Sequence, residues 1–308
     1  MKITIAVPTH NRASTLAQTL ASIAALELDG IDAQCLVIDN RCTDDTPALV
    51  GRFAATMPVP TRLIYEAGPG SSYARNRAFD EASGDYILFL DDDAVADPRW
   101  ALEIIAEMER RALDCACGLV LARWSQPPPP WLGPALYAKL AVHDPVTGGN
   151  PTWERMVNYF SVNVALRRHV PDRFGRFRQD LGVVGGNPIS GEDTELFAQV
   201  QAKGGKIGFA PRAVVHHLIG PERLTRSYFR RKAFAYGIGS AVAGGRHHNR
   251  LDKVLKNALR MLAARARGDA TAVLLHELEC INFVGFWRGR LWHRAAATPP
   301  DDYCGAGR

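Results

Sequence analysis

Short apolar runs alternate with segments of helical spacing over the first 120 residues. The apolar runs predict strands at residues 3–7, 35–38, 62–65 and 86–90, and a fifth strand that ends at 119–121. Helices are predicted at 14–26, 46–53 and 71–82, and Asp97-Pro98 would supply the N-cap and the first position of a fourth helix. Strands joined by such short helical crossovers pair in parallel. The pattern therefore predicts an α/β fold whose ligands bind beyond the carboxyl ends of its strands.

The pattern changes after residue 125, where the prolines at 127–130 exclude regular structure. A short helix is predicted at 131–140, a strand at 159–166, a helix at 194–202, and short strands at 207–210 and 213–215. From residue 222 onward the spacing predicts helices. The sheet-forming patterns thus end near residue 220.

Composition places the chain among ordinary globular proteins. Its 308 residues are 47% hydrophobic and 22% charged, which excludes a disordered or collagenous chain. The longest apolar stretches fall short of the roughly 20 residues that span a bilayer, and the apolar run at the N-terminus is shorter than the roughly 7–15 residues of a signal-peptide core. We therefore expect a cytoplasmic protein. The six cysteines form no C-x-x-C pair, so we expect reduced thiols.

The net charge of +5 is unevenly distributed along the chain. Residues 1–220 carry 21 basic and 25 acidic side chains, whereas residues 221–308 carry 16 basic and 7 acidic ones. An acidic body with a basic tail indicates two separate tasks. The tail is expected to attract an anionic surface or substrate.

Acidic residues follow two of the predicted strands. Asp91-Asp92-Asp93 comes directly after the strand at 86–90, and carboxylate oxygens are the ligands that Mg²⁺ and Mn²⁺ share with substrate phosphates. The alternative is a loop of solvated acids. Asp39 ends the second strand, where it can accept a hydrogen bond from the ring N–H of a base or from nearby backbone amides.

Three further groups are candidates for chemistry. The segment around Gly70 and Arg75 is neither a P-loop nor a G-x-G-x-x-G motif, which disfavours P-loop enzymes and nicotinamide dehydrogenases. Of Glu192-Asp193, one acid would cap the following helix and the other is free to act as a general base. His216-His217 follows the last apolar strand and either binds a metal or phosphate or has a structural role.

Taken together, these segments resemble the inverting glycosyltransferases of family 2, which use nucleotide sugars. The resemblance covers residues 1 to about 220 and implies the GT-A fold, a Rossmann-like, mostly parallel central sheet flanked by helices. It rests on Pro8-Thr9-His10-Asn11-Arg12, Val37-Ile38-Asp39-Asn40 with Thr43-Asp44-Asp45-Thr46, Gly70 with Ala74-Arg75-Asn76, Phe89-Leu90-Asp91-Asp92-Asp93, and Gly191-Glu192-Asp193.

The resemblance also implies a domain organisation. Residues 1–220 would form the catalytic domain, with a nucleotide-binding half at 1–120 and an acceptor-binding half at 121–220. Residues 221–308 would be a basic, helical C-terminal extension.

On the donor side, the resemblance implies that Asp39 contacts the base, usually uracil. Pro8, Thr9 and Arg12 would line the same pocket, with Arg75 nearby. The acidic run would contact the rest of the donor: Asp91 the ribose or the metal, Asp92 beside it, and Asp93 a Mn²⁺ or Mg²⁺ ion on the diphosphate.

On the side of the transferred sugar, Asp193 would be the catalytic base, with Glu192 as the other member of the pair. His216 or His217 would complete the diphosphate or metal site. Asn163 lies where family members often have a residue near the sugar.

The implied function is a metal-dependent, inverting transfer of one sugar from a UDP-linked donor to a hydroxyl of a saccharide or a lipid-linked cell-envelope acceptor. The Q-x-x-R-W motif of processive synthases is absent, so a single transfer is expected rather than polymerisation. One alternative is a sugar nucleotidyltransferase, although residues 8–12 do not match its Gly-rich signature. Another is a non-enzymatic protein that binds an anionic polymer, which leaves Asp193 unexplained; we expect no nucleic-acid partner.

The basic tail has two possible roles. Arg223, Arg226 and Arg230 have the spacing of one helical face, and residues 281–294 combine aromatic side chains with arginines. Such a tail suits peripheral association with anionic lipid at the inner face of a membrane. Alternatively, it packs on the catalytic domain or on a second subunit in a homodimer.

Overall fold

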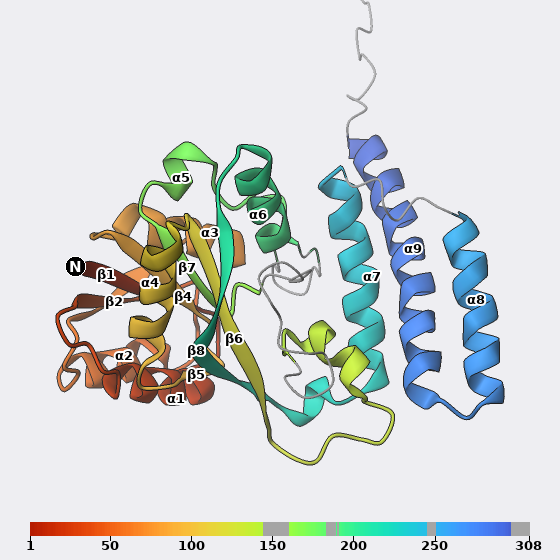
Figure 1. Ribbon diagram of the computed structural model, residues 1–308, viewed down its shortest axis with the longest axis horizontal. Helices are drawn as coiled ribbons and strands as arrows, with labels where there is room; N and C mark the ends of the chain where they lie inside the picture. Colours follow the sequence, from red (N-terminus) through yellow and green to blue (C-terminus); the bar gives the residue numbers. More distant parts are fainter. Residues whose placement is uncertain (144–159, 183–188, 190, 245–250, 297–308) are drawn as a thin grey trace, which may run out of the picture.

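The computed structural model describes residues 1–143, 160–182, 189, 191–244 and 251–296. Within these residues, eight strands form one mixed sheet in the order β3-β2-β1-β4-β7-β6-β8-β5. Helices cover both faces of the sheet, and α7, α9 and α8 stand side by side beyond one end of it (Figure 1). The predicted α/β fold with a helical C-terminal part is confirmed.

The first half of the chain follows the predicted alternation closely. Four neighbouring strands are parallel and are connected through helices. The elements are β1 (Lys2–Thr9), α1 (Ala13–Ala24), β2 (Asp32–Asp39), α2 (Thr46–Ala54), β3 (Thr61–Tyr65), α3 (Ser71–Glu81) and β4 (Tyr86–Leu90).

The second half is more irregular than the sequence suggested. Its elements are β5 (Ala94–Ala96), α4 (Trp100–Arg111), β6 (Cys115–Trp124), η1 (Pro134–Leu140), β7 (Asn163–Arg167), α5 (Val170–Arg173), α6 (Glu192–Ala202) and β8 (Ile207–Ile219). β5 and α5 were not predicted. The two short strands at 207–210 and 213–215 are one strand, which shifts register against β6 between Gly118 and Leu119. β7 is antiparallel to both β4 and β6.

The start of α4 corrects one prediction. The helix begins at Trp100, not at Pro98, and Asp97 makes no side-chain cap. The Asp97 carboxylate instead lies 3.0 Å from His216 Nε2, while its carbonyl accepts a hydrogen bond from the Trp100 amide. The Asp97 side chain contacts His216 of β8, so it does not cap α4.

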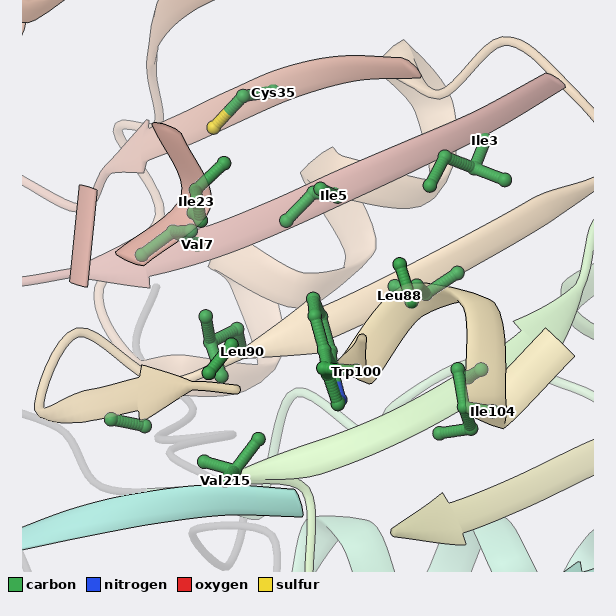
Figure 2. Packing of buried hydrophobic residues seen from close by; sticks show 14 of the residues in the cluster. Ile3, Ile5, Val7, Ile23, Cys35, Leu88, Leu90, Trp100, Ile104 and Val215 are labelled. Carbon is green, nitrogen blue, oxygen red and sulfur yellow. The ribbon is translucent and has the colours of Figure 1, made fainter. Parts of the chain in front are cut away.

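Alternate residues of the strands fill two hydrophobic cores. Ile5 and Leu88 face α1, α2 and α4 and pack in one cluster with Trp100, as Figure 2 shows. Residues on the opposite face, such as Phe89, pack against α3 and α6. This period of two is the usual consequence of a strand with both faces covered.

A third core joins the C-terminal helices to the body. They are η2 (Pro221–Arg223), α7 (Arg226–Val242), α8 (Leu251–Ala266) and α9 (Ala270–Ala296). Leu136 of η1 packs there with Phe229 of α7 and Leu278 of α9. Close packing of α7 on α9 depends on Gly237, because a Cβ at this position would lie 2.1 Å from the carbonyl oxygen of Asn282.

The predicted face of three arginines does not form. Arg223 belongs to η2 and precedes α7, Arg226 lies over the Trp131 ring, and Arg230 pairs with Glu277 at 2.8 Å. None of the helices in the described part of the chain combines the length and hydropathy needed to cross a membrane. The five cysteines in that part are free thiols, and Cys304 lies outside it.

Candidate active site

The strand ends come together as their parallel pairing requires. Thr9 pairs with Asp39, and Ala6 pairs with Phe89, so β1, β2 and β4 end at one edge of the sheet. The loops beyond this edge open on a cleft of about 1260 Å³. Predicted site residues that line it are Pro8, Thr9, Arg12, Arg75, Asp91, Asp92, Asp93, Glu192, Asp193 and His217. One cleft is thus lined by both the acidic run, Asp91–Asp93, and the acid pair, Glu192 and Asp193.

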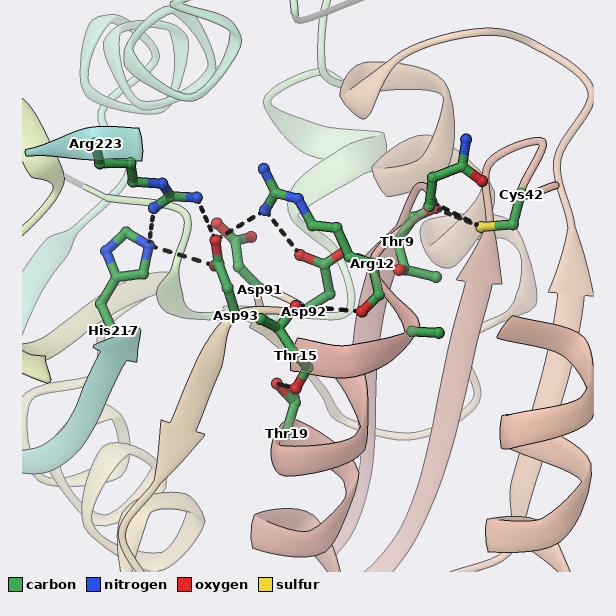
Figure 3. Close-up of polar contacts among 12 residues, drawn as sticks. Thr9, Arg12, Thr15, Thr19, Cys42, Asp91, Asp92, Asp93, His217 and Arg223 are labelled. Carbon is green, nitrogen blue, oxygen red and sulfur yellow. Dashed lines mark hydrogen bonds and ion pairs between the residues drawn. The ribbon is translucent and has the colours of Figure 1, made fainter. Parts of the chain in front are cut away.

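The acidic run after β4 is matched by arginines from other elements (Figure 3). Arg12 lies 3.1 Å from Asp92 and 2.8 Å from Asp93. Arg75, which is only 5% exposed, bonds to Asp91 at 3.1 Å. Arg223 contacts Asp93 as well. These cations compensate three adjacent carboxylates, two of which are buried.

The two buried acids of the run differ in their affinity for protons. Burial raises the pKa of Asp92 to about 6, although the Arg12 guanidinium opposes the shift. Asp92 also accepts a hydrogen bond of 2.7 Å from the Thr9 hydroxyl. Burial acts on Asp93 too, but His217, Arg223 and Arg12 hold its pKa well below the usual value. Asp93 therefore stays ionised to a lower pH than Asp92.

The acid pair at the start of α6 divides into two roles. Glu192 accepts hydrogen bonds of 2.9 Å from Ser71 and from Arg75, so Arg75 bridges Asp91 and Glu192. Asp193 is half-buried, and one of its carboxylate oxygens accepts a 2.7 Å hydrogen bond from the Thr194 amide. Burial and then the negative charge of Glu192 raise the pKa of Asp193. Glu192 thus has a cationic partner, whereas Asp193 binds a proton more readily than an ordinary aspartate.

The two histidines point to opposite sides of β8. His217 lines the cleft, and its Nε2 atom is 3.3 Å from Asp93 and 2.7 Å from Arg223. His216 bonds to Asp97 and does not line the cleft. Adjacent strand residues alternate in direction, so the structure places His217 with the acidic run and His216 away from it.

Asp39, expected at the base, and Asn163, expected near the sugar, both have structural partners. Asp39 is 5% exposed, does not line the cleft, and accepts a 2.6 Å hydrogen bond from the Cys42 amide. This bond shapes a turn in which Arg41 has a left-handed backbone, with φ of 62°. Asn163 is fully buried and bonds to Leu119, Ala213 and Trp100. Neither side chain is exposed to the cleft.

Part of the cleft is lined by residues that no motif in the sequence indicates. Its outer wall includes Tyr228, Lys232 and Tyr236 of α7 and Glu279 and Asn282 of α9. Partial burial, followed by the charges of Asp193 and Glu279, raises the pKa of Tyr236, so this phenol lies near the acid pair. A spacing of four along α7 aligns the three side chains on one face, but no sequence signal connects that face to β4.

The residues present fit a hard divalent cation only in part. In the described part of the chain, no three histidine, cysteine or acidic side chains meet with metal-ligand geometry. Asp91 and Asp93 nevertheless offer carboxylate oxygens to the cleft, and Mg²⁺ is commonly held by one or two carboxylates together with substrate phosphates. The buried Nδ1 atom of His217 has no partner among the described residues. A cation here would need donor oxygens to complete its coordination.

Solved structures share this architecture. The mannosyltransferase PcManGT of Pyrobaculum calidifontis, solved with GDP-Man and Mn²⁺, matches with a TM-score of 0.65 at 19% identity, over 95% of this chain and 87% of that one. S. aureus TarS 1–349, solved with UDP-GlcNAc, matches with a TM-score of 0.51 at 16% identity, over 96% of this chain and 92% of that one. At these identities the likeness concerns the fold, which is GT-A.

Sequence comparison agrees with the fold. The succinoglycan biosynthesis protein ExoM of Rhizobium meliloti (strain 1021) is 28% identical over 241 residues, which are 77% of this chain and 73% of ExoM. The glycosyltransferase AglD of Haloferax volcanii is 27% identical over 127 residues, and the match spans only 20% of AglD. The model of glycosyl transferase family 2 matches residues 4–179, more than half of the chain. The chain therefore belongs to glycosyl transferase family 2 and is a glycosyltransferase.

Proposed function

We propose that this enzyme transfers one sugar from a UDP-linked donor to a hydroxyl of a saccharide or lipid-linked acceptor, with inversion and with a divalent metal ion. The observation that carries the proposal is the common cleft of Asp93 and Asp193, joined through the Asp91–Arg75–Glu192 bridge. A metal-binding carboxylate and a proton acceptor are the two groups that such a displacement requires.

The donor diphosphate would bind at the acidic run. Arg12 and Arg223 approach Asp93 from two sides and are the cations nearest to it among the described residues. Asp91 and Asp93 would hold Mn²⁺ or Mg²⁺ together with the phosphates, and the ion when bound would neutralise charge on the leaving diphosphate. His217 keeps Asp93 ionised and oriented. Pro8 and Thr9 would form the floor below the nucleotide.

The acceptor hydroxyl would lose its proton to Asp193. Its oxygen forms a bond to the anomeric carbon while the bond from that carbon to the diphosphate oxygen breaks. The leaving group departs with the electron pair, and one direct displacement inverts the anomeric centre. The raised pKa of Asp193 makes it a stronger base than an ordinary carboxylate, and Glu192 with Arg75 positions the first turn of α6.

The acceptor would lie against the wall formed by α7 and α9. This wall offers the rings of Tyr228 and Tyr236 for stacking and Lys232, Glu279 and Asn282 for hydrogen bonds to hydroxyl groups. The Nζ atom of Lys139, from η1, lies 3.5 Å from Glu279. Aromatic faces beside polar groups suit a saccharide, which combines apolar ring faces with hydroxyl groups.

The names of relatives support the substrate class. ExoM is a succinoglycan biosynthesis protein, and the TarS relatives are named as poly(ribitol-phosphate) β-N-acetylglucosaminyltransferases. We therefore propose a cell-envelope saccharide as the acceptor. We also propose that the enzyme is cytoplasmic and acts on this acceptor at the inner surface of the membrane. Solved neighbours contain UDP-GlcNAc in one case and GDP-Man with Mn²⁺ in another, so the nucleotide is the part to test first.

Calorimetric titration of the whole chain with UDP and with GDP, each with and without Mn²⁺, tests the donor. We expect UDP to bind more tightly than GDP and Mn²⁺ to strengthen the binding. At a hundredfold excess over its dissociation constant, the ligand should stabilise the fold by about 2.7 kcal/mol. Tighter GDP binding would overturn the uridine assignment, and absence of nucleotide binding would overturn the proposed donor site.

A further inference from the structure

Helix α8 exposes a continuous row of leucines. Leu251, Leu255, Leu259 and Leu262 have spacings of four, four and three, which place them on one helical face. Each is between 60% and 67% exposed. A row of this length extends over roughly three turns, or about 16 Å. Single exposed leucines are ordinary on a protein surface, but contiguous apolar faces mark sites of interaction.

The leucine row is not the face that holds α8 in the fold. On its other side, Asn257 bonds to His276 of α9 at 3.0 Å, and Ala264 is fully buried. The Cys280 thiol of α9 also lies 3.9 Å from the carbonyl oxygen of Val254. α8 thus packs on α9 through one face and leaves its leucines exposed on another. Figure 1 shows α8 at the outer side of the three-helix layer.

Basic side chains flank the leucine row. α8 contains Lys253, Lys256, Arg260 and Arg265 and a single acid, Asp252. The four basic residues are exposed. The C-terminal half of α9 adds exposed Val284, Trp287 and Leu291 with exposed Arg288. Apolar rows bordered by lysine and arginine are the pattern of helices that lie in the plane of a membrane interface.

We propose that the leucine row of α8 docks the enzyme on an anionic phospholipid bilayer. The leucines enter the boundary between head groups and acyl chains, and Lys256 and Arg260 contact the lipid phosphates. A second copy of the chain fits this face less well, because pairing two such rows about a twofold axis brings their basic flanks together. The inference does not depend on the donor or acceptor proposed above.

Flotation of the full chain with phospholipid vesicles tests the proposal. We expect binding to vesicles of phosphatidylcholine with phosphatidylglycerol, weaker binding in added salt, and little binding to phosphatidylcholine alone. The double variant Leu255→Glu/Leu259→Glu should lower the vesicle partition coefficient by about tenfold or more. Lys256→Gln/Arg260→Gln should lower it by about fivefold for each charge removed.

Tyr65→Glu serves as the matched control, since Tyr65 is 61% exposed on β3 and should not affect flotation. Thermal melting and UDP titration of every variant show that the fold and donor site are intact. Unchanged flotation of the leucine variant, or no flotation of the wild type, would overturn the proposal. So would a dimer in sedimentation that the leucine variant dissociates without any loss of lipid binding.

Discussion

Asparagine in place of Asp193 removes the proposed proton acceptor while preserving the shape of the site. The Asp193 Oδ1 atom accepts its shortest hydrogen bond from the Thr194 amide, at 2.7 Å, and the asparagine carbonyl oxygen can accept the same bond. The start of α6 should therefore keep its geometry. The contacts of the acidic run do not include Asp193, so donor binding should also persist.

The expected loss of turnover follows from the role of a general base. Such groups contribute about 10²–10⁴ in rate, which corresponds to about 2.7–5.4 kcal/mol in the barrier. Stability should move in the other direction. Burial and the Glu192 carboxylate raise the pKa of Asp193, so the ionised form is less favourable in the folded chain than in the unfolded one. Above the ordinary pKa of aspartate this charge lowers stability, and Asp193→Asn should therefore melt at the same or a higher temperature at neutral pH.

The assay compares turnover, donor affinity and melting temperature for matched variants. Glu195→Gln is the control, because Glu195 lies in the same helical turn, contacts Gln199 and does not line the cleft. Glu192→Gln should reduce turnover less than Asp193→Asn. Near-normal turnover of Asp193→Asn, with donor affinity retained, would show that another residue takes the proton. Loss of donor affinity instead would show that residue 193 belongs to the donor site.

Three other predictions concern the metal, the buried cation and pH. Asp93→Ala should weaken UDP binding in the presence of Mn²⁺ more than in its absence, as measured by calorimetry. Arg75→Met should destabilise the protein by about 3–5 kcal/mol in urea unfolding, because it removes the cationic partner of buried Glu192 and of half-buried Asp91; Arg77→Met, at a partly exposed ion pair with Glu81, should cost less than about 1 kcal/mol. Burial lowers the pKa of His143 to about 4. The free energy of unfolding should therefore be unaffected by this group above pH 6.5 and should fall by up to about 3 kcal/mol as the pH drops to 4. For His143→Asn, the free energy of unfolding should depend less on pH over this range.

The sequence predicted which strand ends meet at the cleft, because the relevant information is local. β1, β2 and β4 are apolar runs that end in polar loops, and parallel pairing brings such ends together. Arg12 therefore lies in one cleft with Asp92 and Asp93 and contacts both acids. Asp39 shows the limit of this reasoning, because its carboxylate binds the backbone of its own turn. The position of an acid at the end of a strand does not decide whether its carboxylate binds a ligand or a backbone amide.

The wall of the cleft formed by α7 and α9 could not be predicted in the same way. Periodicity identified α7 as a helix, but the face that it turns to the cleft depends on packing with η1 and α9. β7 enters the sheet antiparallel between β4 and β6, which no strand–helix alternation indicates. Asn163, expected near the sugar, instead joins β6, β8 and α4 through its amide. These outcomes follow from contacts between residues far apart in the sequence.

An arginine contact connects the C-terminal helices to the acidic run. Arg12 and Arg75 reach the acidic run from the sheet domain, whereas Arg223 reaches Asp93 from the turn that precedes α7. A diphosphate bound at Asp93 would compete for Arg223, and the change would reach the first turn of α7, where Tyr228 lines the cleft. Because α7 packs closely on α9 through Gly237, the two helices would respond together. The helical extension is thus one wall of the cleft, so a diphosphate at the proposed donor site would bear directly on how the proposed acceptor is held.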